Sequence, residues 1–196
     1  MLNKVRIAHL YISPGHNFVG HHGRPPGEHD IIEVAEVECV AGHGLRGDRY
    51  FDHSANHKGQ ITFFALEVYE ALCQELAVTD KSPAAFRRNA LTVGVDLQAL
   101  IGLPFTIQGV CFEGVEACRP CYWMNRTFHP QAEAKLQGRG GLRARILTTG
   151  VLRIDWPEPP DGESSRSAAD HQSDFLLHQA TPRTTSLEGY KTSVMR

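Results

Sequence analysis

The chain is divided into short segments that are rich in β-branched and aromatic residues and are separated by glycine and proline turns. This pattern constrains the fold more than any other feature. Strands are predicted over residues 5–12, 31–40, 59–65, 86–94, 104–115 and 143–155. Helices are predicted over residues 66–76 and 120–137, with one helical turn at 96–101. Because strands outnumber helices, we expect a mostly β, α+β domain with a compact, barrel-like arrangement rather than an alternating βαβ sheet.

The composition changes at Pro157. The segment 157–165 reads Pro-Glu-Pro-Pro-Asp-Gly-Glu-Ser-Ser, and the rest of the chain to Arg196 is rich in serine, threonine, histidine and glutamine. Such a composition buries too little apolar surface to offset the entropy of ordering the chain. We therefore expect one domain over residues 1–156 and a mostly disordered tail over residues 157–196.

Charge and cysteine content narrow the class of protein. The chain has 20 basic and 22 acidic residues, a balance that predicts neither nucleic-acid nor membrane-surface binding. No apolar run is long enough to cross a bilayer, so no membrane association is expected. Five cysteines, an odd number, favour reduced thiols and a cytoplasmic protein over a disulfide framework.

Two cysteines three positions apart, Cys118 and Cys121, lie between a predicted strand and a predicted helix. Arg119 is adjacent, and Pro120 suits the first turn of a helix, so both features would favour a reactive thiolate at Cys121. The alternative is that both cysteines are small buried apolar residues. The spacing alone favours neither interpretation, because an isolated C-x-x-C motif is a weak signal.

A second polar motif, Phe-Arg-Arg-Asn, opens the strand predicted over residues 86–94. In a strand, Arg87 and Asn89 would share one face and Arg88 would point to the other. Arg87 and Asn89 would then address one carboxylate or phosphate ligand. The alternative is that these side chains hold a buried carbonyl group.

Two glycine-rich segments also carry charges. The first contains Arg46, Asp48 and Arg49 and is either a small anion-binding nest or a tight turn with a surface ion pair. The second, residues 138–145, places Arg143 and Arg145 on one face of the strand that follows.

A long loop over residues 17–30, together with His16 before it, is rich in histidine. His16, His21, His22 and His29 offer metal ligands, but no cysteine or fixed spacing organises them. A polar loop over the mouth of the domain is the alternative. His16 and His21 are retained as candidate site residues.

Taken together and in order, these motifs resemble the MOSC domain, the C-terminal domain of molybdenum-cofactor sulfurases. The resemblance covers residues 4–156 and rests on Gly-Leu-Arg-Gly-Asp-Arg at 44–49, Phe-Arg-Arg-Asn at 86–89, Asp-Leu-x-x-Leu-Ile-Gly at 96–102, Ala-Cys-Arg-Pro-Cys at 117–121 and Gly-Arg-Gly-Gly-Leu-Arg-Ala at 138–144. The histidine-rich loop looks like that of a small bacterial stand-alone subgroup. The resemblance implies a β-rich, barrel-like MOSC fold and a role around the molybdenum cofactor (molybdopterin).

The resemblance also implies roles for particular residues. The family's cysteine, which carries sulfur or binds molybdenum, falls on Cys121, the implied catalytic residue and metal ligand. The positions that hold the pterin and its phosphate in amidoxime-reducing members match Arg87 and Asn89. Those members have an arginine where this chain has Pro120, which weakens the case for their activity here. Further arginines and one acid are expected around the cofactor: Arg46, Asp48, Arg49, Arg119, Arg143 and Arg145.

Three functions remain open at this level. The first is a molybdenum-cofactor protein, either an oxidoreductase of N-hydroxylated compounds or a carrier of sulfur or cofactor, with separate electron-transfer or cofactor-delivery partners. The second is a thiol redox protein that uses Cys118 and Cys121. The third is a non-enzymatic zinc module that uses the loop histidines with Cys121. Pyridoxal phosphate is associated with the family only through a desulfurase domain, for which we find no counterpart in the 196 residues.

Overall fold

The computed structural model describes residues 5–18 and 25–157. His21 and His22, and the predicted tail apart from Pro157, lie outside these residues. Within the described residues no helix is long and apolar enough to cross a membrane.

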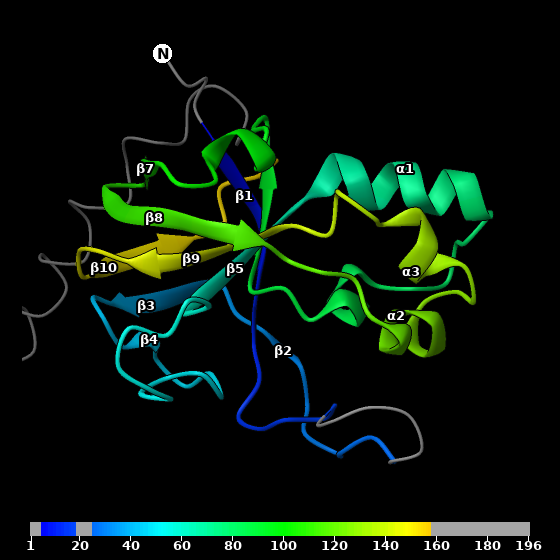
Figure 1. Cartoon of the computed structure of the whole chain (residues 1–196), viewed down its shortest axis with the longest axis horizontal. Helices are drawn as coiled ribbons and strands as arrows, with labels where there is room; N and C mark the ends of the chain where they lie inside the picture. Colours follow the sequence, from blue (N-terminus) through cyan, green and yellow to red (C-terminus); the bar gives the residue numbers. More distant parts are fainter. Residues whose placement is uncertain (1–4, 19–24, 158–196) are drawn as a thin grey trace, which may run out of the picture. The chain divides into compact units, whose positions relative to one another are not determined.

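The larger of two sheets has seven strands, and β5 and β6 lie near its centre (Figure 1). Neighbouring strands are antiparallel, except that β5 and β6 run parallel. In spatial order the strands are β2 (Ile32–Glu33), β1 (Arg6–Ile12), β6 (Ala90–Val93), β5 (Ile61–Ala65), β9 (Leu142–Ile146), β8 (Val110–Ala117) and β7 (Pro104–Ile107).

The smaller sheet has three antiparallel strands. They are β10 (Gly150–Arg153), β3 (Glu36–Val40) and β4 (Gly44–Leu45). The expected α+β class with strands in the majority is confirmed. The described strands do not close into a barrel, because β2 and β7 form the two free edges of the larger sheet.

Strand β5 separates two apolar clusters. Its side chains alternate between the faces of the sheet, so that Phe63 packs with Phe112 and Leu142 in one cluster. Phe64 packs in the other cluster with Leu72 and Phe86. The first cluster is the core between strands, and the second attaches the helices.

Helix α1 (Leu66–Leu76) begins directly after β5 and ends at Ala77, which adopts a left-handed conformation with φ of 53°. Its bounds are those that the apolar periodicity predicts. Figure 1 shows it with α2 (Tyr122–Thr127) and α3 (Ala132–Lys135) to one side of the strands. The predicted helix at 120–137 is therefore interrupted near Pro130, as expected, but it begins two residues late, at Tyr122. Two short 3₁₀ helices complete the domain, η1 (Pro83–Phe86) and η2 (Gln98–Leu100).

Several predicted strands are in fact pairs of shorter ones. Residues 104–115 contain the β7–β8 hairpin, because Gln108 and Gly109 both have positive φ, as a two-residue hairpin turn requires. Residues 31–40 divide into β2 and β3, and residues 143–155 divide into β9 and β10.

The strand predicted from Phe86 begins only at Ala90. Pro83 starts the 3₁₀ helix that occupies residues 83–86, and Arg87 then has φ of 55°. A left-handed residue breaks the alternation of side chains that an extended strand would give.

Candidate functional site

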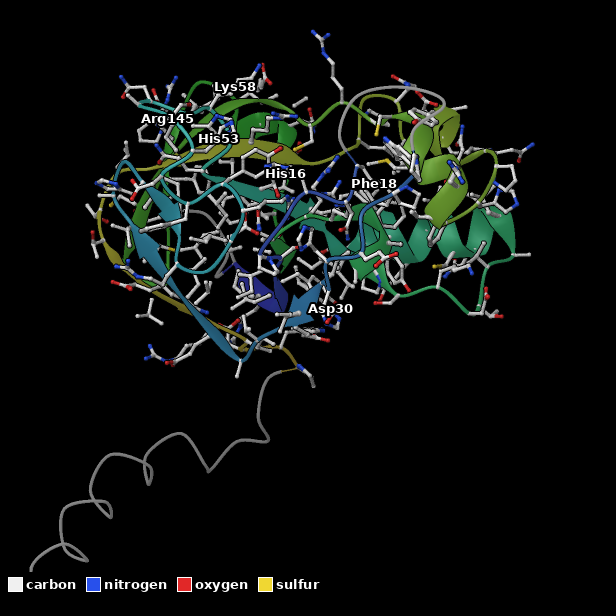
Figure 2. The ribbon with its side chains drawn as sticks, turned by 90° about the horizontal axis from the view of Figure 1, so that it is seen from below. His16, Phe18, Asp30, His53, Lys58 and Arg145 are labelled. Atoms are coloured by element: carbon white, nitrogen blue, oxygen red, sulfur yellow. The ribbon has the colours of Figure 1, made fainter. Side chains whose placement is uncertain are left out.

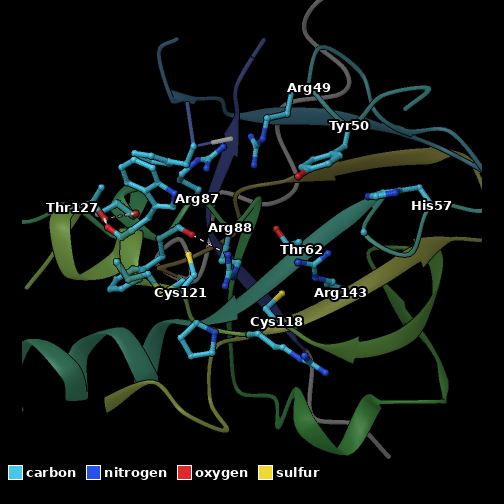
Figure 3. A pocket seen from close by; sticks show the side chains of 18 residues that line it. Arg49, Tyr50, His57, Thr62, Arg87, Arg88, Cys118, Cys121, Thr127 and Arg143 are labelled. Carbon is cyan, nitrogen blue, oxygen red and sulfur yellow. Dashed lines mark hydrogen bonds between the residues drawn. The ribbon is translucent and has the colours of Figure 1, made fainter. Parts of the chain in front are cut away.

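A cavity of about 330 Å³ opens where β8 ends, beside α2 and the segment after η1. Figure 3 shows Cys121 and Arg87 toward one end, and Tyr50 and His57 toward the other. This volume is within the usual range for small-molecule sites, roughly 300–1,000 Å³. The described lining residues include no carboxylate, and their basic side chains are Arg49, His57, Arg87, Arg88, Arg119 and Arg143.

The two cysteines of the C-x-x-C motif differ in exposure. The amide of Cys118 donates to the carbonyl of Gly141 (2.8 Å), and Cys118 is buried. A side chain at Gly140 would clash with the carbonyl oxygen of Cys118, so only glycine allows this close approach. Cys121 is exposed and caps the N-terminus of α2, where its carbonyl accepts from the amide of Met124 (2.9 Å). Cys121 is thus the accessible thiol of the pair.

The sequence predicts that Pro120 starts a helix with Cys121 in its first turn, and the structure shows that this prediction is wrong. Pro120 does not open the helix, and Cys121 precedes the first helical turn rather than belonging to it. Helix α2 has only six residues, so its dipole contributes less than that of a long helix.

Arg87 is a half-buried cation with few partners. Its guanidinium lies over the ring of Phe18, with 4.6 Å from Cζ to the ring centroid. Its Nε is buried and has no hydrogen-bond partner among the described residues. Burial, followed by the charge of Arg49, lowers the pKa of Arg87 to about 10. A partly desolvated cation beside other cations is a place where an anion is stabilising.

Arg49 is held at the cavity by the residue before it. Asp48 is buried and accepts hydrogen bonds from the amides of Ser13 and Tyr50, both at 3.1 Å. Nη1 of Arg49 lies 3.3 Å from Asp48 Oδ1, while its Nε has no partner among the described residues. Asp48 therefore fixes the loop, and Arg49 presents a donor at the wall.

Aromatic and imidazole rings form one side of the cavity. His57 is stacked on Tyr50 with ring centroids 5.0 Å apart, and His53 meets His57 edge-on at the same distance. His16 packs against Tyr50 at 5.0 Å and His53 at 6.1 Å, and Figure 2 shows it in the same segment as Phe18. Burial, followed by the charges of Arg49 and Arg87, lowers the pKa of His16.

The family model of the MOSC domain matches residues 50–157 of this sequence, more than half of its 196 residues. The chain belongs to the MOSC domain family. No curated protein matches its sequence.

Solved structures share the fold at low sequence identity. YuaD from Bacillus subtilis has a TM-score of 0.58 at 16% identity, covering 76% of this chain and 92% of that one. YiiM from Geobacillus stearothermophilus has a TM-score of 0.54 at 15% identity, covering 76% and 71%. YiiM from Escherichia coli has a TM-score of 0.50 at 20% identity, covering 63% and 61%. At these identities the likeness describes the fold alone.

In this MOSC domain the side chains of the Arg-Arg-Asn motif do not lie where the sequence predicts. Both Arg87 and Arg88 line the cavity, because the left-handed Arg87 interrupts the expected alternation. Arg88 is tied to the backbone: its Nε donates to the carbonyl of Gly140 (3.0 Å) and its Nη1 to that of Phe86 (3.1 Å).

Asn89 is not among the lining residues and is buried behind the wall. Its Oδ1 accepts from the amide (3.0 Å) and hydroxyl (2.8 Å) of Thr62, and its Nδ2 donates to the carbonyl of Tyr11 (3.1 Å). These bonds connect β5, β6 and β1. The observed role of Asn89 is to hold three strands together.

The remaining candidate arginines of the MOSC domain divide into two groups. Arg119 and Arg143 line the cavity. Arg46 lies at the surface, where its Nε pairs with Glu38 at 2.8 Å, and Arg145 pairs with Glu113 at 2.9 Å. The structure therefore does not bring Arg46 and Arg145 to the cavity.

The sequence did not single out several wall residues. Phe18, Tyr50, His57, Thr62 and Trp123 line the cavity, and none of them is a member of the motifs, although Tyr50 and Trp123 lie within two residues of one. The spacing of His53 and His57, directly after the Arg49 segment, was the one available signal. As for a zinc site, the described residues contain no group of three histidine, cysteine or acidic side chains that would hold a metal.

Proposed function

We propose that this MOSC domain binds the molybdenum cofactor in the arginine-lined cavity, with the thiolate of Cys121 as the metal ligand. It then acts as an oxidoreductase of N-hydroxylated compounds or as a carrier of sulfur or cofactor. One observation carries the proposal: the exposed thiol of Cys121 opens onto the same cavity as the half-buried guanidinium of Arg87, whose buried Nε has no partner among the described residues. Soft metals favour thiolate ligands, and guanidinium groups favour phosphate.

The donors at the wall fit such a ligand. Arg49 Nε, Arg87 Nε and the indole nitrogen of Trp123 are buried without hydrogen-bond partners among the described residues. Buried donors are normally paired, so each of these is best explained by an acceptor on a ligand. The phosphate and the polar ring system of a pterin offer such acceptors.

Each wall residue has a role in this proposal. Cys121 would hold the metal, Arg87 and Arg49 would hold the phosphate, and Trp123 would donate to the ring system. Phe18, over which Arg87 is stacked, would shield the phosphate from water and so strengthen its attraction to the guanidinium. When bound, the cofactor supplies redox and sulfur chemistry at molybdenum.

Pro120 stands where amidoxime-reducing relatives have an arginine. In this chain Arg119 lines the cavity, so a guanidinium is still available beside the cysteine motif. The position of Arg119 supports cofactor binding. It does not decide between reduction of N-hydroxylated compounds and transport of sulfur or cofactor. Reduction would require a separate protein or small molecule as the electron donor.

The test is to purify the full chain from a host that makes the cofactor and to measure molybdenum and pterin content. We expect both in the wild type, and expect Cys121→Ser and Arg87→Ala to lose most of the molybdenum. Arg46→Ala is the matched control, because it removes a surface arginine outside the cavity. Absence of molybdenum and pterin from the wild type, or equal loss in the Arg46 variant, would contradict the proposal.

A thiol redox function is the second candidate, because Cys118 and Cys121 line the same cavity. It predicts a reversible Cys118–Cys121 disulfide in metal-free protein, measured by peptide mass spectrometry after oxidation by glutathione disulfide. A disulfide that also forms in cofactor-loaded protein would favour this function, because a metal-bound thiolate is protected.

A further inference from the structure

His57 differs in its surroundings from two surface histidines of the chain. His9 pairs with Glu33 at 2.6 Å, and His43 pairs with Asp52. The ring of His57 has no hydrogen bond or ion pair among the described residues, although it lines the cavity. Its contacts are aromatic, with Tyr50 and His53. A cavity-facing imidazole with free nitrogens is available to a ligand or a proton.

The groups around His57 are mainly cationic. Burial lowers its pKa first, followed by His53, Arg143 and Lys58. Glu116 is the nearby carboxylate, but it already pairs with Lys58 (2.8 Å) and Arg143 (3.6 Å). The titratable and charged groups that face this region are Tyr50, His53, Lys58, Arg143, Glu116 and, through Glu116, Arg119, together with His16 and Arg49 on the other side of Tyr50.

An anion in the cavity would reverse this balance. No carboxylate is among the described residues that line the cavity, so a bound anion would add a negative charge where the lining supplies at most the thiolate of Cys121. A negative charge nearby favours the protonated form of an imidazole and offsets the repulsion from the arginines. Protonation in turn favours the anion, since the two equilibria are linked.

We propose that the cavity takes up a phosphate-like oxyanion together with one proton, and that His57 holds this proton. The proposal rests on the proposed function for the identity of the natural anion, the phosphate of the cofactor. It deepens that function by making cofactor binding a proton-coupled event. The protonated His57 thus adds one positive charge to the site when the negatively charged ligand binds.

Sulfate is a suitable probe because it mimics phosphate in shape and carries no proton that titrates over the histidine range, about pH 5 to 8. Histidine NMR of cofactor-free full-length protein is recorded against pH in chloride and in sulfate. We expect sulfate to raise the pKa of His57 and to leave that of the surface His43 unchanged. A rise of about one unit makes sulfate binding about tenfold tighter below the titration than above it.

Isothermal titration calorimetry in two buffers of different ionisation enthalpy counts the protons taken up on sulfate binding. We expect uptake as the pH falls below about 6.5, because the pKa of His57 is lowered in the free protein and rises on binding; we expect its loss in His57→Gln and its retention in His43→Gln. Failure of sulfate to bind, binding without proton uptake, uptake unchanged in His57→Gln, or a shift at His16 or His53 instead of His57 would each overturn the proposal. The NMR measurement on the wild type is independent of whether the variants fold.

A second experiment distinguishes a cofactor phosphate from a free oxyanion as the bound anion. It also tests the proton coupling separately from the proposed function. In cofactor-loaded protein, a cofactor phosphate in the cavity should already have raised the pKa of His57, so that added sulfate changes nothing. If sulfate still acts there, the site binds a free oxyanion instead, which overturns the assignment to the cofactor. Cofactor that copurifies without any shift at His57 contradicts the proton coupling alone. Proton-linked sulfate binding by protein that never acquires cofactor contradicts the proposed function alone.

Discussion

The wall of the cavity and the polar network directly behind it use neighbouring residues for opposite purposes. Arg87 and Arg49 face the cavity with an unpartnered nitrogen each. Asn89 and Asp48, only one or two positions away, are buried and joined by a 3.3 Å contact between Asn89 Nδ2 and Asp48 Oδ1. The difference shows that a polar motif can contain both cavity-lining and framework residues. The two groups are distinguished by whether their polar atoms have hydrogen-bond partners within the protein, rather than by residue type.

The largest expected contrast is in thiol reactivity. Cys121 is exposed at the wall, whereas burial raises the pKa of Cys39 to about 12. We expect iodoacetamide to label Cys121 faster than Cys39 by about two orders of magnitude or more in metal-free protein, because only an accessible thiolate reacts. Peptide mass spectrometry over a time course measures both rates. Bound cofactor should suppress the labelling of Cys121. If Cys121 does not react, it is not the reactive thiol of the cavity wall.

The framework should respond most strongly to Asn89→Ala. The variant removes bonds to Thr62 and Tyr11 and leaves buried groups unpaired, so we expect a loss of about 3 kcal/mol in the free energy of unfolding. Urea denaturation measures it. Asn125→Ala is the matched control, because the side chain of Asn125 bonds only to Glu133 among the described residues, and it should cost about 1 kcal/mol. Normal stability with weakened anion binding would instead make Asn89 part of the binding wall.

Arg87→Ala should show the opposite pattern. Binding of sulfate or cofactor should weaken about tenfold or more, because a charge-assisted hydrogen bond is worth about 1.5–3 kcal/mol. The free energy of unfolding should not fall by more than about 0.5 kcal/mol, since removing a desolvated cation relieves repulsion from Arg49. Calorimetry and urea denaturation measure the two effects. A large loss of stability would place Arg87 in the framework.

The smallest expected effect is the pH dependence of stability. The pKa values of His16 and His57 are lowered in the folded protein from the ordinary value of 6.5. The unfolded chain then binds more protons as the pH falls below this value, so stability should decrease from neutral pH into this range. Replacing both histidines by glutamine should flatten the decrease, as urea denaturation at several pH values would show. An unchanged slope would mean that other groups dominate.

Local patterns allowed much of the fold to be predicted from sequence. The apolar periodicity at Tyr69, Leu72 and Leu76 predicts α1, and β-branched runs predict β1 and β5. Gly109 marks an interruption of the strand predicted over residues 104–115, but the hairpin turn that it forms with Gln108 escaped prediction because glutamine rarely adopts positive φ. The left-handed Arg87 escaped for the same reason, and with it the true directions of Arg88 and Asn89.

The site was predictable only in part. Motifs indicated Cys121, Arg49, Arg87, Arg119 and Arg143, which do line the cavity. Whether an arginine pairs with a carboxylate depends on residues that are distant in sequence, as for Arg145 with Glu113. The approach of Tyr50 and His57 to the cysteine motif is equally non-local, because it depends on the pairing of β5 and β8 with β9.

The cavity gathers residues from Phe18 to Arg143, so no short piece of the chain contains its wall. It therefore exists only in the folded domain, and a ligand that fills it binds the folded chain and not the unfolded one. Such a ligand at one hundred times its Kd adds about 2.7 kcal/mol to the free energy of unfolding. Protein without ligand unfolds more often and is more open to proteolysis. The supply of ligand in the cell would thereby set how long each molecule survives.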